Sequence, residues 1–128
     1  MKVLHIALWA NDLEKMKGFY CRFFHGIAGK NYQNEVKNFE SCFVNFESGI
    51  SLELMRNTNR VLPSGPEYMT TGFHHLAFSV GTREEVDQLT LLINNAGYTV
   101  KSKPRVTGDG FYESVIIDPE GNTIEITV

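Results

Sequence analysis

The chain has 128 residues, a net charge of −3 and 42% hydrophobic side chains. This length allows one domain, or two closely packed halves of about 60 residues each, with enough apolar surface for a core. The small, unclustered charge argues against a nucleic-acid partner, and no apolar run is long enough for a membrane span. Because the N-terminal stretch does not resemble a signal peptide, we expect a cytoplasmic protein with free thiols at Cys21 and Cys42.

The first half of the chain is predicted to form a strand, a helix and three further strands. Residues 2–9 alternate in the manner of a strand, and Asn11 or Asp12 can cap a helix over about 12–24 that ends at Gly26. The apolar residues at helical spacing, expected in the core, are Leu13, Met16, Phe19, Tyr20, Phe23 and Phe24. The three further strands are expected at about 31–36, 40–47 and 50–56.

The second half repeats this plan after a linker at about 58–71, so that module one covers about 1–57 and module two about 72–128. Residues 73–80 predict a strand, followed by a helix over 83–95 that Thr82 caps. The helical residues expected to point inward are Val86, Leu89, Leu92 and Ile93. The remaining strands are expected at about 98–103, 111–117 and 122–127, with residues 118–121 as the final hairpin turn.

The two halves also share a pair of titratable residues. His5 opens the stretch His-Ile-Ala-Leu and His75 opens the stretch His-Leu-Ala-Phe. Glu53 follows His5 by nearly the same number of residues as Glu125 follows His75, and each glutamate lies in a second matched stretch. The duplicated pair predicts a site with four ligands.

Strand alternation places the four residues on one kind of face. Since side chains alternate across a strand, His5, Glu53, His75 and Glu125 each share a face with mostly small or polar residues. Their aliphatic neighbours form the opposite face, which is expected to pack under the helices. His74 directly precedes His75 and should point the other way, so we interpret it as structural or exposed.

A divalent metal explains why the four groups would gather. Burying two carboxylates and two imidazoles together is costly without compensation, and a cation removes this cost. The donor set suits zinc, nickel, cobalt, iron or manganese. A lone strand histidine or glutamate is more often solvated, but two pairs in register are hard to explain in that way. The predicted fold is α+β, with two βαβββ modules whose curved mixed sheets enclose a metal-binding cavity and whose helices lie outside.

Several motifs together resemble a known superfamily over the whole chain. They are His5-Ile6-Ala7-Leu8, Asp12-Leu13 with Phe19-Tyr20, Leu52-Glu53-Leu54, His75-Leu76-Ala77-Phe78-Ser79-Val80, and Asp118-Pro119-Glu120-Gly121-Asn122 with Glu125. This set resembles the vicinal-oxygen-chelate superfamily, which includes glyoxalase I, bleomycin-resistance proteins, fosfomycin-resistance enzymes, methylmalonyl-CoA epimerase and extradiol dioxygenases. The resemblance is more specific for the fold than for the reaction.

The resemblance implies a ligand set of His5, Glu53, His75 and Glu125, which is the pattern of bacterial-type glyoxalase I. Extradiol dioxygenases and fosfomycin enzymes use only the two histidines and the last glutamate, and bleomycin-binding members have usually lost the ligands. The implied activity is that of a metal-dependent lyase or isomerase, lactoylglutathione lyase-like, which transfers a proton next to a chelated carbonyl through an enediolate. Glu125 is then the expected base and Glu53 the partner carboxylate, although the two could exchange roles.

Other positions depart from glyoxalase I. Trp9 stands where that enzyme usually has an arginine, and Thr107 replaces an expected cation, although Arg105 is close. Asn57 does match an asparagine that contacts glutathione. These departures argue against glutathione as the thiol and favour a more apolar or aromatic substrate. The residues expected to bind substrate are Trp9, Met55, Asn57, Arg105 and Phe111, with Tyr112 as a further candidate.

Two other functions stay open at this point. One is a different metal enzyme of the same fold, such as an epimerase, a thiol transferase or a dioxygenase. The other is a non-catalytic protein that binds a small molecule, as resistance proteins do. We expect one divalent ion per site, with zinc or nickel favoured, and a homodimer with no nucleic-acid or membrane partner. The sequence does not decide whether one chain or two chains supply the four ligands.

Overall fold

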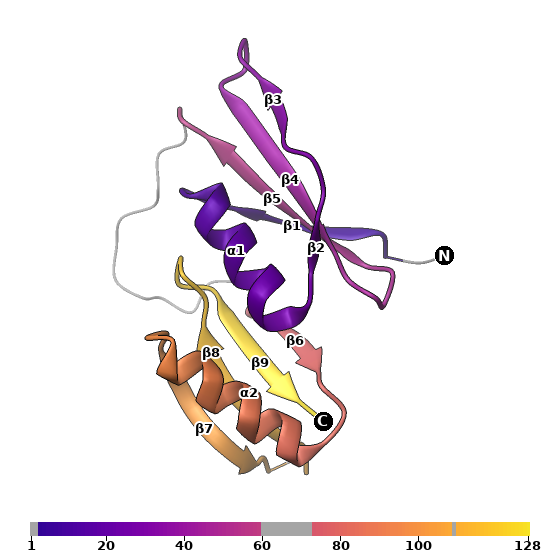
Figure 1. Ribbon diagram of the computed structural model, residues 1–128, viewed down its shortest axis with the longest axis vertical. Coiled ribbons are helices and arrows are strands. Elements are labelled where there is room, and N and C mark those ends of the chain that lie inside the picture. The colour runs from indigo at the N-terminus through magenta and orange to yellow at the C-terminus, as the bar shows by residue number, and fades with distance from the viewer. Residues whose placement is uncertain (1–2, 60–72, 109) are drawn as a thin grey trace. The chain divides into compact units, whose positions relative to one another are not determined.

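The computed structural model describes residues 3–59, 73–108 and 110–128, so most of the predicted linker lies outside the described residues. The chain divides into two compact units, Met1–Phe73 and His74–Val128. Each unit holds one helix and one sheet, as Figure 1 shows. Neither of the described helices has the length and apolar character that crossing a membrane requires.

The first unit is a five-stranded sheet with one helix against it. Its elements are β1 (His5–Trp9), α1 (Leu13–Phe24), β2 (Ile27–Ala28), β3 (Tyr32–Asn34), β4 (Phe39–Asn45) and β5 (Ser51–Asn57). The strand order is β1-β5-β4-β2, and β3 also pairs with β4. The β1–β5 pair is parallel and the other pairs are antiparallel, so β1 and β5 become neighbours although they lie far apart in the sequence.

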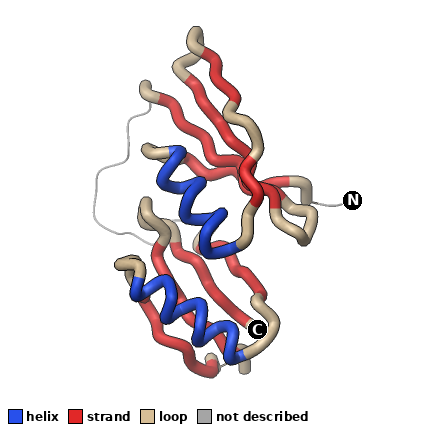
Figure 2. The backbone as a smooth tube through the Cα atoms, in the orientation of Figure 1, coloured by secondary structure: helices blue, strands red, loops and turns tan. Residues whose placement is uncertain are grey.

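The second unit repeats this plan in a four-stranded sheet with the order β6-β9-β8-β7. Its elements are β6 (His75–Ser79), α2 (Arg83–Asn95), β7 (Val100–Val106), β8 (Tyr112–Ile117) and β9 (Thr123–Thr127). The β6–β9 pair is parallel, like β1–β5 in the first unit. Figure 2 shows the same succession of strand, helix and strands in both units. The predicted α+β class and the repeated plan are therefore confirmed.

Side-chain caps start both helices where the sequence predicts them. Asp12 Oδ1 accepts a hydrogen bond from the backbone N–H of Lys15 at 3.0 Å. Thr82 Oγ1 accepts one from the N–H of Glu85 at 3.2 Å. Each cap satisfies a backbone donor that the first helical turn leaves unpaired, which fixes where the helix begins.

The helix cores follow the predicted apolar spacing with one exception. All six apolar residues predicted for α1 are buried. In α2, Val86 and Ile93 are buried and Leu89 is half-buried, but Leu92 is 51% exposed and the prediction for it is wrong. Thr90 is buried in its place. Its hydroxyl contacts the carbonyl oxygen of Val86 and the hydroxyl of Ser114, both at 2.6 Å, so a polar side chain is buried here with its hydrogen bonds satisfied.

The end of α1 and the strand after it differ from the prediction. His25, not Gly26, adopts the left-handed conformation that ends the helix, with φ 54°. Gly26 instead lies where the backbone packs closely against β4, because a Cβ at this position would overlap Cγ1 of Val44. This approach brings the unpredicted strand β2 alongside β4. A two-residue strand carries too little periodicity to be seen in a sequence.

β7 is longer than predicted and runs through Pro104. The strand lies at the edge of its sheet, where a residue without an N–H need not break a ladder on both sides. Its pairing with β8 shifts register twice, between Val100 and Ser102 and between Ser102 and Arg105. Proline is tolerated in this irregular edge, and the predicted end at residue 103 is therefore too early.

Candidate metal centre

The first unit brings His5 and Glu53 together on adjacent parallel strands. β1 aligns His5 with Ser51 and Ala7 with Glu53, so that the histidine and the glutamate are diagonal neighbours on one face. His5 Nε2 lies 3.7 Å from Glu53 Oε2. The histidine side chain is 47% exposed and that of the glutamate 18% exposed, so the carboxylate lies deeper than the ring.

The second unit forms the matching pair in the matching register. β6 aligns His75 with Thr123 and Ala77 with Glu125. His75 Nε2 lies 3.2 Å from Glu125 Oε2, with side-chain exposures of 36% and 21%. The two pairs therefore share sequence position, strand pairing and the ring nitrogen that faces the carboxylate.

Burial confirms the strand phase predicted for the glutamates. Leu52 and Leu54 flank Glu53 and are buried, and Ile124 and Ile126 flank Glu125 and are buried. Their buried face contacts the helix of the same unit, as Figure 1 shows. The glutamates therefore point to the helix-free face of each sheet.

His74 lies nearer to the second pair than strand alternation predicts. Its Nδ1 is 2.8 Å from Nδ1 of His75, and the two ring centroids are 5.1 Å apart. Because His74 precedes the first residue of β6, strand alternation does not determine where its ring points. One of the two nitrogens must carry the proton that the other accepts, so the contact ties the tautomer of each ring to that of its neighbour.

An aromatic ring lies beside the paired histidine of the first unit. The edge of Phe43 meets the His5 ring, with centroids 5.4 Å apart and planes at 85°. Phe43 is also the direct cross-strand partner of Glu53. No signal in the sequence marks Phe43, because only the pairing of β4 with β5 brings it beside the His5–Glu53 pair.

Two of the predicted substrate-binding residues share the helix-free face of the first sheet. Trp9 and Met55 are direct partners across β1 and β5, two residues along each strand from Ala7 and Glu53. Asn57 lies at the end of β5, where its amide donates to the carbonyl of Lys37 at 3.2 Å. Its Oδ1 accepts from the N–H of Asn59 at 2.9 Å, so both ends of this amide make local hydrogen bonds.

The predicted residues of the second unit are also engaged locally. Arg105 Nη2 lies 3.5 Å from Oε1 of Glu113, its partner across β7 and β8. Phe111 is exposed, and its backbone N–H donates to Thr107 Oγ1 at 3.0 Å while its carbonyl accepts from the Thr107 N–H at 2.8 Å. Thr107 therefore acts as a turn residue in this structure.

Tyr112 belongs to the helix side of its sheet. Its hydroxyl donates to Asp87 Oδ1 at 2.7 Å, and the Arg83 guanidinium lies 4.9 Å from the ring centroid. The hydrogen bond to the Asp87 carboxylate raises the pKa of Tyr112. These contacts connect the tyrosine to α2, so it does not share the face of Glu125.

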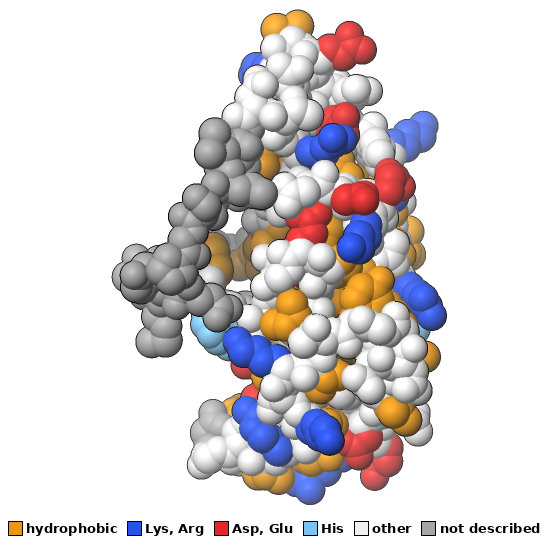
Figure 3. All heavy atoms as spheres, turned by 90° about the vertical axis from the view of Figure 1, so that its left-hand side faces the viewer, with side chains coloured by type: hydrophobic (Ala, Val, Ile, Leu, Met, Phe, Trp, Pro, Cys, Tyr) orange, Lys and Arg blue, Asp and Glu red, His pale blue; other side chains and the backbone are white. Residues whose placement is uncertain are grey.

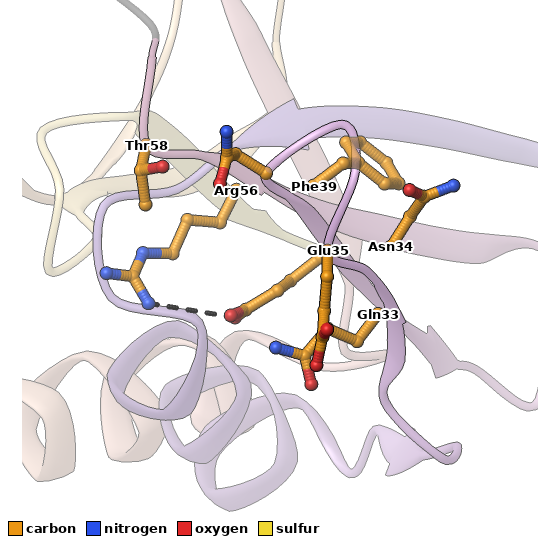
Figure 4. A pocket seen from close by; sticks show the side chains of 8 residues that line it. Gln33, Asn34, Glu35, Phe39, Arg56 and Thr58 are labelled. Atoms are coloured by element: carbon orange, nitrogen blue, oxygen red, sulfur yellow. Dashed lines mark ion pairs between the residues drawn. The ribbon is translucent and has the colours of Figure 1, made fainter.

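A polar pocket of about 140 Å³ lies beside the β3–β4 turn of the first unit, as the close view in Figure 4 shows. Arg56 and Glu40 both line it, and Arg56 Nη1 lies 3.6 Å from Glu40 Oε2. Strand alternation points Arg56 away from the face of Glu53. This pocket is therefore distinct from the His5–Glu53 pair, and no motif in the sequence marks it.

Neither the charges on the face drawn in Figure 3 nor the two described thiols point to another site. On the face drawn in Figure 3, basic and acidic side chains are interspersed rather than gathered by sign. Cys21 and Cys42 are both free, and burial raises the pKa of the Cys42 thiol, which disfavours the thiolate form of a nucleophile. In the described part of the chain, no three His, Cys, Asp or Glu side chains form one metal-binding cluster, and each unit contributes a pair.

Comparison with known proteins places this geometry in a family. The family model of the Glyoxalase/Bleomycin resistance protein/Dioxygenase superfamily matches residues 2–126. A curated relative is the uncharacterized protein YqjT of Bacillus subtilis (strain 168). It is 30% identical over an alignment of 132 positions, which covers 95% of this chain and 94% of that protein.

Solved structures share the fold at lower identity. A glyoxalase family protein from Enterococcus faecalis is 24% identical with a TM-score of 0.80, covering 99% of this chain and 97% of its own. Glyoxalase I from Zea mays is 21% identical with a TM-score of 0.80, and the match covers 98% of this chain but 44% of the maize chain. The repeated fold and the family match together show that the chain belongs to the glyoxalase/bleomycin resistance/dioxygenase superfamily.

Proposed function

We propose that the protein is a divalent-metal-dependent lyase or isomerase of the glyoxalase I type. The observation that carries the proposal is the duplicated pair, in which a histidine Nε2 faces a glutamate carboxylate on the helix-free face of each sheet. Family membership supports it, since the superfamily includes glyoxalase I. The proposed ligands are His5, Glu53, His75 and Glu125.

The donor set fits a divalent metal. Two imidazole nitrogens and two carboxylates suit zinc or nickel, which we favour, and also cobalt, manganese and iron. When bound, the cation would supply a Lewis acid for two neighbouring substrate oxygens. Nε2 is the ring nitrogen that faces the carboxylate in both units, so both histidines present the same atom to the proposed ion.

The two glutamates have different roles in the proposed reaction. Glu125 takes the proton from the carbon next to the substrate carbonyl and returns it to the neighbouring carbon, as a general base and then a general acid. Glu53 is the partner carboxylate. Both carboxylate side chains are largely shielded from solvent, which limits competition from bulk water for the transferred proton.

The substrate is proposed to lie over the strand residues beside the pairs. Trp9 and Met55 share the face of Glu53 in the first unit. The further proposed contacts are Arg105, Phe111 and Asn57, of which Arg105 and Asn57 already have local partners. A substrate that recruits Arg105 must compete with Glu113, which weakens the case for a glutathione carboxylate at this position.

Metal analysis and turnover test the proposal together. Protein purified without added metal is analysed for elements, with His75→Ala as the control. It is then incubated with methylglyoxal and a panel of thiols, with nickel, zinc or cobalt added, while thioester absorbance is followed. The proposal expects bound divalent metal that the variant loses, together with thioester formation. Metal without turnover on any thiol would reject the lyase, and an iron(II) and catechol panel would then test the dioxygenase.

A non-catalytic binding protein is the competing function, and the exposed aromatic side chains of the first sheet favour it. Its signature would be tight binding of a small molecule that a chelator leaves unchanged. Under the lyase proposal, removing the metal abolishes turnover and weakens binding of any ligand that chelates the ion.

We further propose a homodimer that acts in the cytoplasm, where Cys21 and Cys42 stay reduced. Mixing the variants His5→Ala and Glu125→Ala tests how ligands are shared between chains. If a site takes its ligands from two chains, the mixture recovers metal binding that neither variant shows alone. If each site lies within one chain, the mixture recovers none.

A further inference from the structure

We infer that the helix-free face of the first sheet binds a planar aromatic group of the substrate, next to the His5–Glu53 pair. The inference rests on the proposed function and names its substrate class: an α-hydroxy carbonyl compound, or its thiol adduct, with an aryl group on the carbon chain. It is carried by the side chains that the strand register brings to this face.

The register lines up three cross-strand rows on this face. Across β1, β5 and β4, the row of Glu53 contains Ala7, Glu53 and Phe43. The next row, two residues along each strand, contains Trp9, Met55, Ser41 and Tyr32. The third row contains Asn57, Phe39 and Asn34. Successive rows are about 7 Å apart, so an aryl group one or two bonds from a chelated carbonyl reaches the second row.

Three aromatic side chains of the second and third rows contact one another, and Phe43 of the first row contacts the His5 ring. The Trp9 and Phe39 rings meet edge to face with centroids 6.5 Å apart, and Tyr32 lies 6.3 Å from Phe39. Trp9, Tyr32 and Phe43 are 42%, 55% and 37% exposed. Such edge and tilted contacts hold the rings in place while leaving surface on which another ring can stack.

The same face offers no cation among the described strand residues of the first unit. The residues that share the face of Glu53 on β1, β3, β4 and β5 include neither lysine nor arginine. Arg56 points to the opposite face, and the Asn57 amide is occupied by backbone groups. A peptide thiol with two carboxylates would find no counter-charge here, whereas an uncharged ring would find apolar partners.

The test compares two chelators that differ by one ring. Benzohydroxamate and acetohydroxamate present the same vicinal oxygens, but only the first carries a phenyl group. Trp9 is the one tryptophan of the sequence, so its emission reports directly on this face. Both compounds are titrated into the metal-loaded and the chelator-treated protein, with fluorescence and calorimetry as the readouts. Their affinities for the free metal serve as the reference.

The expected result is about three- to tenfold tighter binding of benzohydroxamate, beyond its preference for the free metal, with quenching of Trp9. Trp9→Leu and Phe39→Leu should lose this preference in calorimetry, while the control Leu92→Ala, which changes an exposed helix residue of the second unit, should keep it. Equal corrected affinities overturn the inference, as does a preference that survives both substitutions. Absence of ring-dependent quenching in both metal-loaded and chelator-treated protein also overturns it.

Turnover separates this inference from the proposed function. Phenylglyoxal and methylglyoxal are compared with the thiol that supports the fastest reaction, as kcat/KM. If neither reacts with any thiol while the ring preference persists, the lyase is rejected and the aromatic site stands. If both react equally well and Trp9→Leu lowers neither, the lyase stands and the aromatic site is rejected.

Discussion

Replacing Glu125 by Gln separates a metal ligand from an ordinary ion pair. Without metal, Glu125 and His75 form a partly exposed pair at 3.2 Å. Pairs of this kind contribute about 0–1 kcal/mol to stability, because water screens them and two side chains must be ordered. In excess chelator, the free energy of unfolding of Glu125→Gln should therefore lie within about 1 kcal/mol of wild type.

Metal should reveal a larger difference. At a free metal concentration of about 100 Kd, a single site stabilises the folded protein by about 2.7 kcal/mol. Loss of one ligand should weaken binding at least about 100-fold, since even a supporting residue outside the ligand set is worth about 10- to 100-fold. At the same metal concentration the variant then gains about 0.4 kcal/mol, so the metal-dependent difference is about 2.3 kcal/mol.

Urea unfolding with EDTA and with added zinc or nickel measures both quantities. Glu113→Gln is the matched control, because Glu113 lies on the helix-free face of the same sheet and pairs with Arg105. The control should keep the full metal stabilisation. Equal stabilisation of wild type and Glu125→Gln by metal would refute the ligand assignment. A loss well above 1 kcal/mol in EDTA would instead show that the pair is mainly structural.

Three further predictions concern the local contacts of His74, Asp118 and Gly26. His74→Leu, which removes the 2.8 Å partner of His75, should weaken metal binding about tenfold in a dye competition, and unchanged affinity would mean that the contact is incidental. Asp118→Ala removes the acceptor of three hydrogen bonds at 2.8–2.9 Å and should cost about 2–4 kcal/mol in urea unfolding, with a loss below about 1 kcal/mol contradicting its role. Gly26→Ala should lower the free energy of unfolding by about 1–3 kcal/mol, because its Cβ would overlap a β4 side chain. Gly18→Ala has open space at its Cβ and should raise the free energy of unfolding by up to about 1 kcal/mol. Calorimetric melting measures both variants, and shifts of the same sign and size would contradict this reasoning.

The parts of the fold that depend on local signals were predictable. The caps at Asp12 and Thr82 and the buried face of α1 follow from short-range spacing, and the structure confirms them. Alternation along a strand likewise predicted which neighbours of Glu53 and Glu125 are buried. In each case the determining interaction lies within a few residues of the one in question.

The parts that depend on a distant partner were missed. Thr90 is buried because Ser114 on another element accepts or donates a hydrogen bond to it. His25 takes the left-handed conformation at the end of α1, and the neighbouring Gly26 lies where an added Cβ would meet Val44 of another strand. Spacing within one segment does not carry this information, because it arises when the segments pack.

The candidate site likewise has a part that local signals predict and a part that depends on distant strand pairing. The His–Glu pairs could be proposed from duplication and strand phase, since both signals lie in the sequence. Phe43, Phe39 and Tyr32 could not be assigned to the face of Glu53, because they reach it through the register of β3 and β4. A register change of one residue would have turned these rings to the helix side.

The surroundings of the two pairs suggest which half sets the substrate. Glu53 has Phe43 as its cross-strand partner, whereas Glu125 has the smaller Val115 in the equivalent place. If metal binding were the only requirement, equivalent neighbours would serve both pairs. The difference lies instead in groups that do not ligate: rings without a cation beside Glu53, and an Arg105–Glu113 pair on the sheet of Glu125. The proposed donor set is thus the symmetric part of the molecule, and the proposed choice of substrate arises from the asymmetric part.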